Sequence, residues 1–217
     1  MGAVYGNEAH LGQVLKELEA KEGCLRSLEK LDCKYINLYW HWPGVEGLDP
    51  GDSRHSEYRA QSWAALEEFY ASGQFRAIGV SNYTAKHIWE LLMSCRVAPS
   101  VPQIECQPKI IQRKPRDLCT LYFGFRFNVY YWMCNGGVLG DGEVMDIVRS
   151  CGRTPAQVLL RWAVQQGISV LPRSSQPCRV QENAQVFDFQ LSEMDIVRLD
   201  ALNCGTRFCK RDSSKVA

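Results

Sequence analysis

The chain has 217 residues, of which 46% are hydrophobic, and its formal net charge is +1. A chain of this length can bury one sizeable core, so we expect a single domain over residues 1–217. The balanced, interspersed charges provide no extended field for nucleic acid or an anionic membrane. No apolar run approaches the ~20 residues of a membrane span, and no basic-then-apolar signal opens the chain, so we expect no membrane partner.

The ten cysteines include no Cys-x-x-Cys pair. They are spread through strand and helix patterns in the way that small hydrophobic residues are. We therefore interpret them as reduced thiols of a cytoplasmic protein rather than as a disulfide framework.

The first part of the chain, residues 1–33, carries two helical patterns with no strand between them. Asn7–Ala20 and Lys21–Leu31 both have an apolar face. In a parallel β/α fold, a second helix without an intervening strand would begin at the wrong end of the sheet. Either the two helices fuse across Gly23, or this truncated part departs from a regular repeat.

From about residue 34, short apolar runs alternate with longer helical stretches, which predicts βαβ units and a parallel sheet. The predicted strands are Tyr35–Trp42, Ala77–Ser81, Val101–Cys106, Phe127–Trp132 and Ile168–Pro172. The predicted helices are Glu57–Ser72, Thr84–Cys95, Pro115–Leu121, Glu143–Cys151, Pro155–Gln166, Pro177–Phe187 and Ser192–Leu202. This periodicity does not distinguish an open sheet covered on both faces from a closed barrel.

Residues that favour helix boundaries support several of these elements. Thr154 precedes Pro155, which places an N-cap before a proline at the first helical position, and Ser192 is a second N-cap candidate. Gly152 and Gly167 follow predicted helices, where glycine commonly ends them. The last residues, 204–217, are predicted to form a loose tail.

Polar residues follow the predicted strands at their carboxyl ends. The segment Gly79-Val-Ser-Asn-Tyr83 closes an apolar run and opens a helical pattern, and polar residues end three other strands in the same way. In repeated β/α folds these ends present amides and hydroxyls to a ligand, so a binding site is predicted there. No Gly-x-Gly-x-x-Gly follows the first strand, so the usual dinucleotide fingerprint is missing.

Several of these motifs, in this order, resemble the aldo-keto reductase family, and the resemblance covers nearly the whole chain. They are Ala3-Val-Tyr-Gly-Asn-Glu8, His41-Trp-Pro43, Gly79-Val-Ser-Asn82, Gln103-Ile-Glu-Cys-Gln-Pro108 and Leu171-Pro-Arg-Ser174 followed by Arg179 and Glu182-Asn183. The resemblance implies an eight-stranded α/β barrel that reduces small aldehydes and ketones with NADPH. That family does not use the glycine fingerprint, and no metal is implied.

The resemblance also implies roles for individual residues. Tyr5 is similar to the family's general acid, and His41 to the residue that orients the carbonyl by hydrogen bonding. The residues implied for the cofactor are Ser81, Asn82 and Gln103 at the nicotinamide carboxamide, Tyr130 stacked on its ring, Arg173, Ser174 and Arg179 at the 2′-phosphate, and Glu182 and Asn183 near the adenine. Two arginines and a hydroxyl at a helix start suit a phosphate dianion, which favours NADP over NAD.

Most of these residues also have a plainer interpretation. The alternatives are a frayed terminus for Tyr5, a buried core histidine for His41, helix N-caps for Ser81 and Asn82, buried polar side chains that satisfy loops for Gln103, a core ring for Tyr130, and a solvated basic turn for Arg173 and Arg179.

Two residues of the family's catalytic tetrad have no counterpart. The aspartate expected five residues before Tyr5 would fall before Met1, and the lysine expected at the end of the next strand belongs to a strand that is missing between Ala20 and Lys21. Lys16 and Lys21 lie on helical patterns and are poor substitutes. An unperturbed tyrosine has a pKa of ~10, and a neighbouring ammonium would lower it, so losing that help costs roughly 10² to 10⁴ in rate.

The predicted architecture is therefore an incomplete (β/α)8 barrel that retains about strands 4–8 with their helices. An open sheet would leave apolar edges at Tyr35–Trp42 and Ile168–Pro172, which predicts self-association. Two functions remain open: an NADPH-dependent reductase with impaired activity, and a non-catalytic family member that binds NADP or a protein partner.

Overall fold

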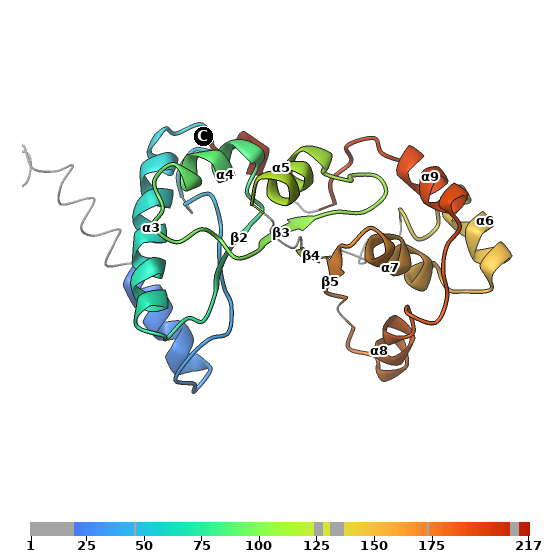
Figure 1. The fold of residues 1–217 in the computed structure, drawn as a ribbon, viewed down its shortest axis with the longest axis horizontal. Coiled ribbons are helices and arrows are strands. Elements are labelled where there is room, and N and C mark those ends of the chain that lie inside the picture. The colour runs from blue at the N-terminus through green and yellow to red at the C-terminus, as the bar shows by residue number, and fades with distance from the viewer. Residues whose placement is uncertain (1–19, 46, 124–127, 131–136, 173, 209–212) are drawn as a thin grey trace, which may run out of the picture. The chain divides into compact units, whose positions relative to one another are not determined.

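The structure is a computed structural model that describes residues 20–45, 47–123, 128–130, 137–172, 174–208 and 213–217. The chain divides into two compact units (Figure 1). Unit 1 comprises Met1–Val101 and Ser213–Ala217, and unit 2 comprises Pro102–Asp212. Each unit is described by itself below.

Unit 1 contains two parallel strands connected by a helix. Strand β1 (Tyr39–His41) pairs with β2 (Ile78–Ser81), and His41 lies opposite Val80 in the register. Helix α3 (Arg54–Ala71) joins the strands, and α4 (Ala85–Leu92) follows β2. This is the βαβ arrangement that the alternating apolar pattern predicts.

Residues 20–30 form one more helix of unit 1, drawn in blue beside α3 in Figure 1. The helix continues through Gly23 without a break, and the ammonium of Lys21 contacts the carboxylate of Glu68 on α3 at 2.9 Å. Helix rather than strand therefore precedes β1, as the sequence predicts. The predicted helix Asn7–Ala20 lies outside the described residues except at Ala20.

Unit 2 contains three strands among its described residues. Strand β3 (Pro102–Glu105) pairs with β4 (Asn128–Tyr130), which pairs with β5 (Ser169–Val170), and both pairings are parallel. The helices of this unit are α5 (Arg113–Phe123), α6 (Gly142–Cys151), α7 (Pro155–Gln165), α8 (Pro177–Ala184) and α9 (Glu193–Ala201). The predicted α/β class with parallel strands is thus confirmed within each unit.

The strands are shorter than the apolar runs that predicted them. The run Tyr35–Trp42 yields only β1 and an isolated bridge between Ile36 and Phe75. The run Ile168–Pro172 yields only β5. Pro172 cannot donate to the sheet, because proline has no N–H. More generally, an apolar run includes buried residues beyond those that form backbone hydrogen bonds with a neighbouring strand.

The predicted helix caps are confirmed. Thr154 accepts a hydrogen bond from the backbone N–H of Gln157, and Pro155 occupies the first helical position of α7. Ser192 caps α9 in the same way, and Gly152 ends α6 in the left-handed conformation at φ 65°. These short-range hydrogen bonds explain why the sequence alone located the helices within a few residues.

Each unit buries its own apolar side chains. In unit 1 the buried residues include Trp63 of α3, Ile78 of β2 and Ile88 of α4, and in unit 2 they include Leu160 and Trp162 of α7. Close packing also explains a glycine within β2. A Cβ atom at Gly79 would lie 2.7 Å from the carbonyl oxygen of Val101 and 3.0 Å from the Trp40 ring, so no larger residue fits there without a shift.

The last five residues are anchored in unit 1. The backbone N–H of Ala217 donates to the carbonyl oxygen of Pro50 at 2.8 Å, and the preceding residues Ser213–Lys215 form a short 3₁₀ helix, η1. Arg59 and His87 donate to the carbonyl oxygens of Ala217 and Val216, at 2.5 and 2.9 Å. This end of the expected loose tail is therefore held by donors that only the folded unit supplies.

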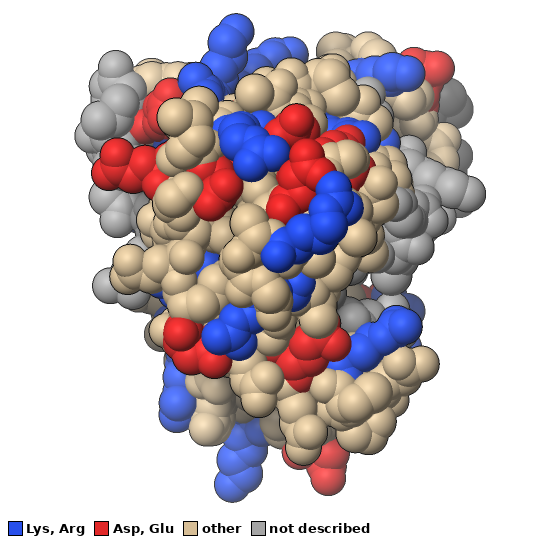
Figure 2. All heavy atoms as spheres, turned by 90° about the vertical axis from the view of Figure 1, so that its right-hand side faces the viewer, with Lys and Arg blue, Asp and Glu red and all other residues tan. Residues whose placement is uncertain are grey.

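Acidic and basic side chains alternate over the surface shown in Figure 2. Ion pairs account for part of this mixing; Arg198 of α9, for example, contacts Glu143 of α6 at 2.8 Å. Among the described residues, no helix has both the length and the apolar character needed to cross a bilayer.

Candidate functional site

The carboxyl ends of β1 and β2 lie at the same edge of unit 1. His41 is the last residue of β1, and Ser81 is the last residue of β2. Since the strands are parallel and His41 pairs with Val80, the backbones of His41, Ser81 and Asn82 lie at the same end of this strand pair. The predicted carbonyl-orienting residue and the first two predicted cofactor residues thus end two paired strands at the same end.

Ser81 and Asn82 do not cap the helix that follows them. The N-cap of α4 is Thr84, whose hydroxyl accepts from the backbone N–H of His87, while the His87 ring accepts from the N–H of Thr84. Asn82 instead takes the left-handed conformation (φ 59°), is 5% exposed and donates to the Ser81 hydroxyl at 3.0 Å. The alternative interpretation of these two residues as N-caps is therefore wrong.

His41 is a half-buried histidine with one hydrogen bond to a described residue. Its Nδ1 lies 2.8 Å from the hydroxyl of Tyr83, and the two rings meet edge to face. Its Nε2 makes no hydrogen bond within the described part of the chain. Burial, and secondly the positive charge of Arg59, lower the pKa of His41 to about 4, so the ring is neutral at pH 7.

We expect this lowered pKa to make the protein less stable in acid. An unfolded histidine has a pKa of ~6.5, so between that pH and about 4 the unfolded chain binds the proton that folded His41 does not. Stability should fall as the pH drops through this window, by at most roughly 3 kcal/mol for this one group.

The measurement is urea unfolding at several pH values for the wild type and for His41→Gln. Burial also lowers the pKa of His87, so the difference between the two proteins isolates His41. The free energy of unfolding of the wild type minus that of His41→Gln should decrease as the pH falls below 6.5. A constant difference across the window would contradict the assignment.

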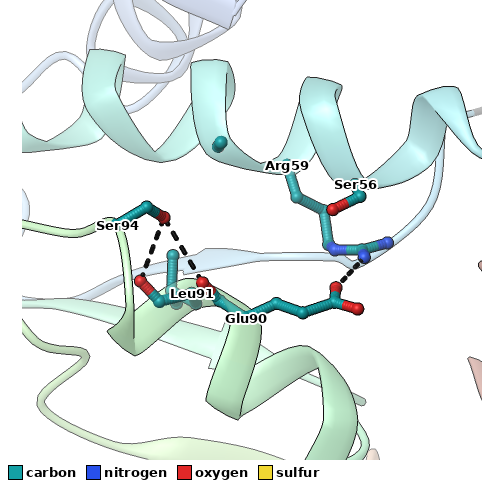
Figure 3. A pocket seen from close by; sticks show the side chains of 6 residues that line it. Ser56, Arg59, Glu90, Leu91 and Ser94 are labelled. Atoms are coloured by element: carbon teal, nitrogen blue, oxygen red, sulfur yellow. Dashed lines mark hydrogen bonds and ion pairs between the residues drawn. The ribbon is translucent and has the colours of Figure 1, made fainter.

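Arg59 of α3 lies close to this edge and is almost fully buried. Its guanidinium donates to Glu90 of α4 at 2.5 Å and to the carbonyl oxygen of Pro43 at 3.2 Å. Arg59 and Glu90 help to line a cavity of about 40 Å³ between α3 and α4, with Ser56, Leu91 and Ser94 around it (Figure 3). A cavity of this size holds about one water molecule, so it is no site for an organic ligand.

Two predicted cofactor residues of unit 2 lie on strands. Gln103 is the second residue of β3 and is half-buried, and its side chain has no hydrogen-bond partner among the described residues. Tyr130 ends β4, where its backbone lies opposite Glu105. Glu105 itself is fully buried, and its carboxylate accepts a hydrogen bond from the N–H of Phe208 at 2.7 Å, so it supports the fold. The side-chain amide of Gln103, by contrast, makes no hydrogen bond to a described residue.

Ser174 and Arg179 lie at the start of α8. The Ser174 hydroxyl accepts from the N–H of Gln176, the N-cap residue, at 3.1 Å. Arg179 is exposed and makes no hydrogen bond or ion pair with any residue that the structure describes. A free guanidinium beside the positive end of a helix can bind an anion.

Glu182 and Asn183, at the other end of α8, serve its packing. The Glu182 carboxylate accepts a hydrogen bond from the Thr154 hydroxyl, and its carbonyl oxygen accepts from Gln157 at 3.2 Å. Asn183 is 8% exposed. In this structure Glu182 ties α8 to the first turn of α7, a role that the sequence pattern did not indicate.

Among the residues considered for catalysis or cofactor binding, Tyr5, Lys16 and Arg173 lie outside the described residues, and the predicted strand Phe127–Trp132 is described only at residues 128–130. Lys21 is described, and its ammonium faces Glu68 on α3 rather than a strand end. Within the described ranges, no group of three or more His, Cys, Asp or Glu side chains is arranged to hold a metal ion.

Two residues at this edge, Tyr83 and Arg59, were not singled out from the sequence. Tyr83 directly follows the Ser81-Asn82 turn, which was the one signal available. Arg59 lies within a predicted helix, and no neighbouring residue in the sequence indicates that its side chain is buried.

The sequence also matches known proteins. The sequence model of the Aldo/keto reductase family matches residues 5–204. The chain is 37% identical to the glyoxal reductase of Bacillus subtilis (strain 168) over 179 residues, which are 82% of this chain and 60% of that protein. It is 33% identical to the aldo-keto reductase family 1 member A1 of Bos taurus, over 95% of this chain and 77% of that one.

The structure is similar to that of the aldose reductase from Schistosoma japonicum, with a TM-score of 0.75 and 29% identity. The match covers 89% of this chain and 66% of the reductase. The chain therefore spans somewhat less than two thirds of some relatives that it matches. The family match extends over most of the chain and agrees with the parallel β/α units, and the chain belongs to the aldo/keto reductase family.

Proposed function

We propose that this protein is an NADPH-dependent carbonyl reductase that converts an aldehyde or ketone to an alcohol, with activity reduced by the loss of the family's catalytic lysine. The observation that carries the proposal is the neutral His41 at the carboxyl end of β1, which pairs with the strand that ends at Ser81 and is followed by Asn82. A neutral imidazole with a free Nε2 can donate to a carbonyl oxygen without adding a charge of its own.

The proposal includes an incomplete (β/α)8 barrel. The described strands β1–β5 would correspond to about the fourth to eighth strands of the family barrel. The parallel pairings within each unit support this correspondence, as does the helix at residues 20–30 directly before β1.

In the proposed reaction, His41 would hydrogen-bond the carbonyl oxygen and orient it, and Tyr5 would protonate that oxygen. NADPH, when bound, supplies the hydride. Negative charge develops on the oxygen as hydride arrives, so donors aimed at it lower the barrier. The family's lysine would assist this proton transfer, and its loss costs roughly 10² to 10⁴ in rate.

The residues proposed for the cofactor fit it in part. Ser81, Asn82 and Gln103 would hold the carboxamide, and Tyr130 would stack on the nicotinamide ring. The guanidinium of Arg179, which has no partner among the described residues, and Ser174 before α8 support a 2′-phosphate site, to which Arg173 would add a second charge. Asn183 and Glu182 would lie near the adenine, although one carboxylate oxygen of Glu182 already accepts a hydrogen bond from Thr154.

One observation favours a second function, that of a non-catalytic family member that binds NADP or a protein partner. Lys21, the described lysine nearest in sequence to the missing strand, pairs with Glu68 at 2.9 Å. An ammonium held on an outer helix cannot assist a tyrosine at the strand ends. Binding without turnover would then be the protein's activity.

The test measures NADPH binding by fluorescence titration and the reduction of an aldehyde by loss of NADPH absorbance. Glyoxal is a suitable first substrate, since one relative is a glyoxal reductase. The wild type should bind NADPH saturably and turn over above His41→Ala. Saturable binding with equal rates in both proteins would favour the second function. Absence of NADPH binding would contradict the reductase and the NADP-binding form of the second function.

A further inference from the structure

The hydroxyl of Tyr83 lies 2.8 Å from Nδ1 of His41. Tyr83 is 2% exposed, and its ring packs edge to face against the rings of both His41 and His87. Within the described part of the chain, Nδ1 of His41 is the only hydrogen-bond partner of this hydroxyl. The contact therefore joins a buried phenol to the ring that the proposed function places on the substrate.

The direction of this hydrogen bond follows from the cost of burying polar groups. Burial is the main cause that raises the pKa of Tyr83, so the phenol keeps its proton. Burying an O–H that donates to nothing costs free energy, and among the described residues its one acceptor is Nδ1. If Nδ1 carried a hydrogen of its own, two donors would face each other unless the phenol proton turned away unpaired. Tyr83 therefore donates, and Nδ1 accepts.

A neutral imidazole has one N–H, so an accepting Nδ1 leaves the hydrogen on Nε2. Burial, and secondly the positive charge of Arg59, oppose a second proton on His41. Burial also keeps the proton on Tyr83; the charge of Arg59 acts against this and that of Glu90 acts with it, but burial is the largest cause. Neither partner gains or loses a proton near pH 7.

We propose that Tyr83 is a positioning residue that holds His41 as the Nε2–H tautomer and so presents Nε2–H as the hydrogen-bond donor of the site. The presentation of that donor to a carbonyl oxygen rests on the proposed function. The tautomer itself does not, because it follows from contacts within unit 1 alone.

Two other histidines of unit 1 provide internal references. Nδ1 of His55 accepts from the N–H of Val45 at 3.2 Å, and its Nε2 faces the carbonyl oxygen of Asp49 at 2.9 Å. His87 has the same arrangement, with the N–H of Thr84 at Nδ1 and the carbonyl oxygen of Val216 at Nε2. Both must be Nε2–H tautomers, because backbone N–H groups only donate and carbonyl oxygens only accept.

The experiment is ¹⁵N NMR of the histidine rings in the complete chain at pH 7, with assignment by substitution of each histidine. His41, His55 and His87 should all show an unprotonated Nδ1 and a protonated Nε2. In Tyr83→Phe, which keeps the ring and removes the donor, the Nδ1 signal of His41 alone should move toward the mixed-tautomer position, and His55 and His87 should not change.

The matched control is Tyr70→Phe, which removes the hydroxyl of an exposed tyrosine on α3. It should leave all the histidine signals unchanged. A protonated Nδ1 on His41 in the wild type, or a His41 signal that is the same in Tyr83→Phe, would overturn the proposal. A general loss of packing would move His55 and His87 as well, so a change confined to His41 separates positioning from unfolding.

A second measurement separates this proposal from the proposed function. If the protein reduces aldehydes, Tyr83→Phe should lower kcat by about 2- to 10-fold, the effect of losing one hydrogen bond, with little change in NADPH affinity. An unchanged kcat beside a shifted His41 tautomer would overturn the positioning role. A wild type without turnover would contradict the proposed reductase, and the NMR result would still decide whether Tyr83 sets the tautomer.

Discussion

Replacing Arg59 with methionine is expected to lower the free energy of unfolding by about 3 kcal/mol. Arg59 is 4% exposed and donates to three acceptors, namely Glu90, the carbonyl oxygen of Pro43 and the carbonyl oxygen of Ala217. Methionine fills a similar volume but donates nothing, so both carbonyl oxygens lose their charged donor. Glu90 is partly exposed and can be hydrated, which keeps the loss below that of a fully buried pair.

The control for this prediction is Lys86→Met, which removes the other cation that contacts Glu90. Lys86 is exposed and lies 3.6 Å from that carboxylate, so its loss should cost less than about 1 kcal/mol. Urea unfolding followed by circular dichroism gives both values. Hydrogen exchange should show lost protection at α4 and residues 213–217 in Arg59→Met only. Equal unfolding midpoints for the two variants would contradict the role of Arg59.

Replacing Arg179 with alanine is expected to weaken NADPH binding by about 10- to 100-fold while NADH binding stays the same. The guanidinium has no partner among the described residues, and Arg179 lies in the first turn of α8. A charged hydrogen bond to the 2′-phosphate would be lost, and NADH has no such phosphate. Stability should change by less than about 0.5 kcal/mol, because no internal contact is removed.

Arg149→Ala is the matched control, since Arg149 is also an exposed helix arginine of unit 2 and its guanidinium pairs with Asp146. Fluorescence titration with both nucleotides measures the four affinities, and salt should be held constant because ionic strength weakens phosphate contacts. Equal losses for NADPH and NADH would mean that Arg179 acts on the fold or on another part of the nucleotide. No loss for either would remove the 2′-phosphate assignment.

These expectations depend on contacts that differ in how far they reach along the chain. The caps at Thr154 and Ser192 join residues three apart, and they were predicted from the sequence. The hydrogen bonds of Tyr83 to His41 and of Arg59 to Ala217 join residues 42 and 158 apart, and they were not. Periodicity records which face of an element is apolar, but it does not record which polar side chain meets which.

The candidate site shows the same division. The motifs around His41, Ser81, Gln103 and Arg179 were enough to identify the family, because each is a local pattern in a characteristic order. The structure adds how these residues are engaged. Ser81 and Asn82 are not caps, Gln103 and Arg179 have no partner among the described residues, and the carboxylate of Glu182 is committed to Thr154.

By itself, the sequence of this protein determined the order of its helices and strands, their caps, and membership of the aldo/keto reductase family. These features arise from local hydrogen bonding and from the alternation of apolar residues. Only the tertiary structure decided that Lys21 pairs with Glu68, that Arg59 donates to Ala217, and that the Tyr83 hydroxyl lies beside Nδ1 of His41. The reason is physical: a buried polar side chain must find a partner, and packing rather than sequence neighbours determines which partner lies within reach.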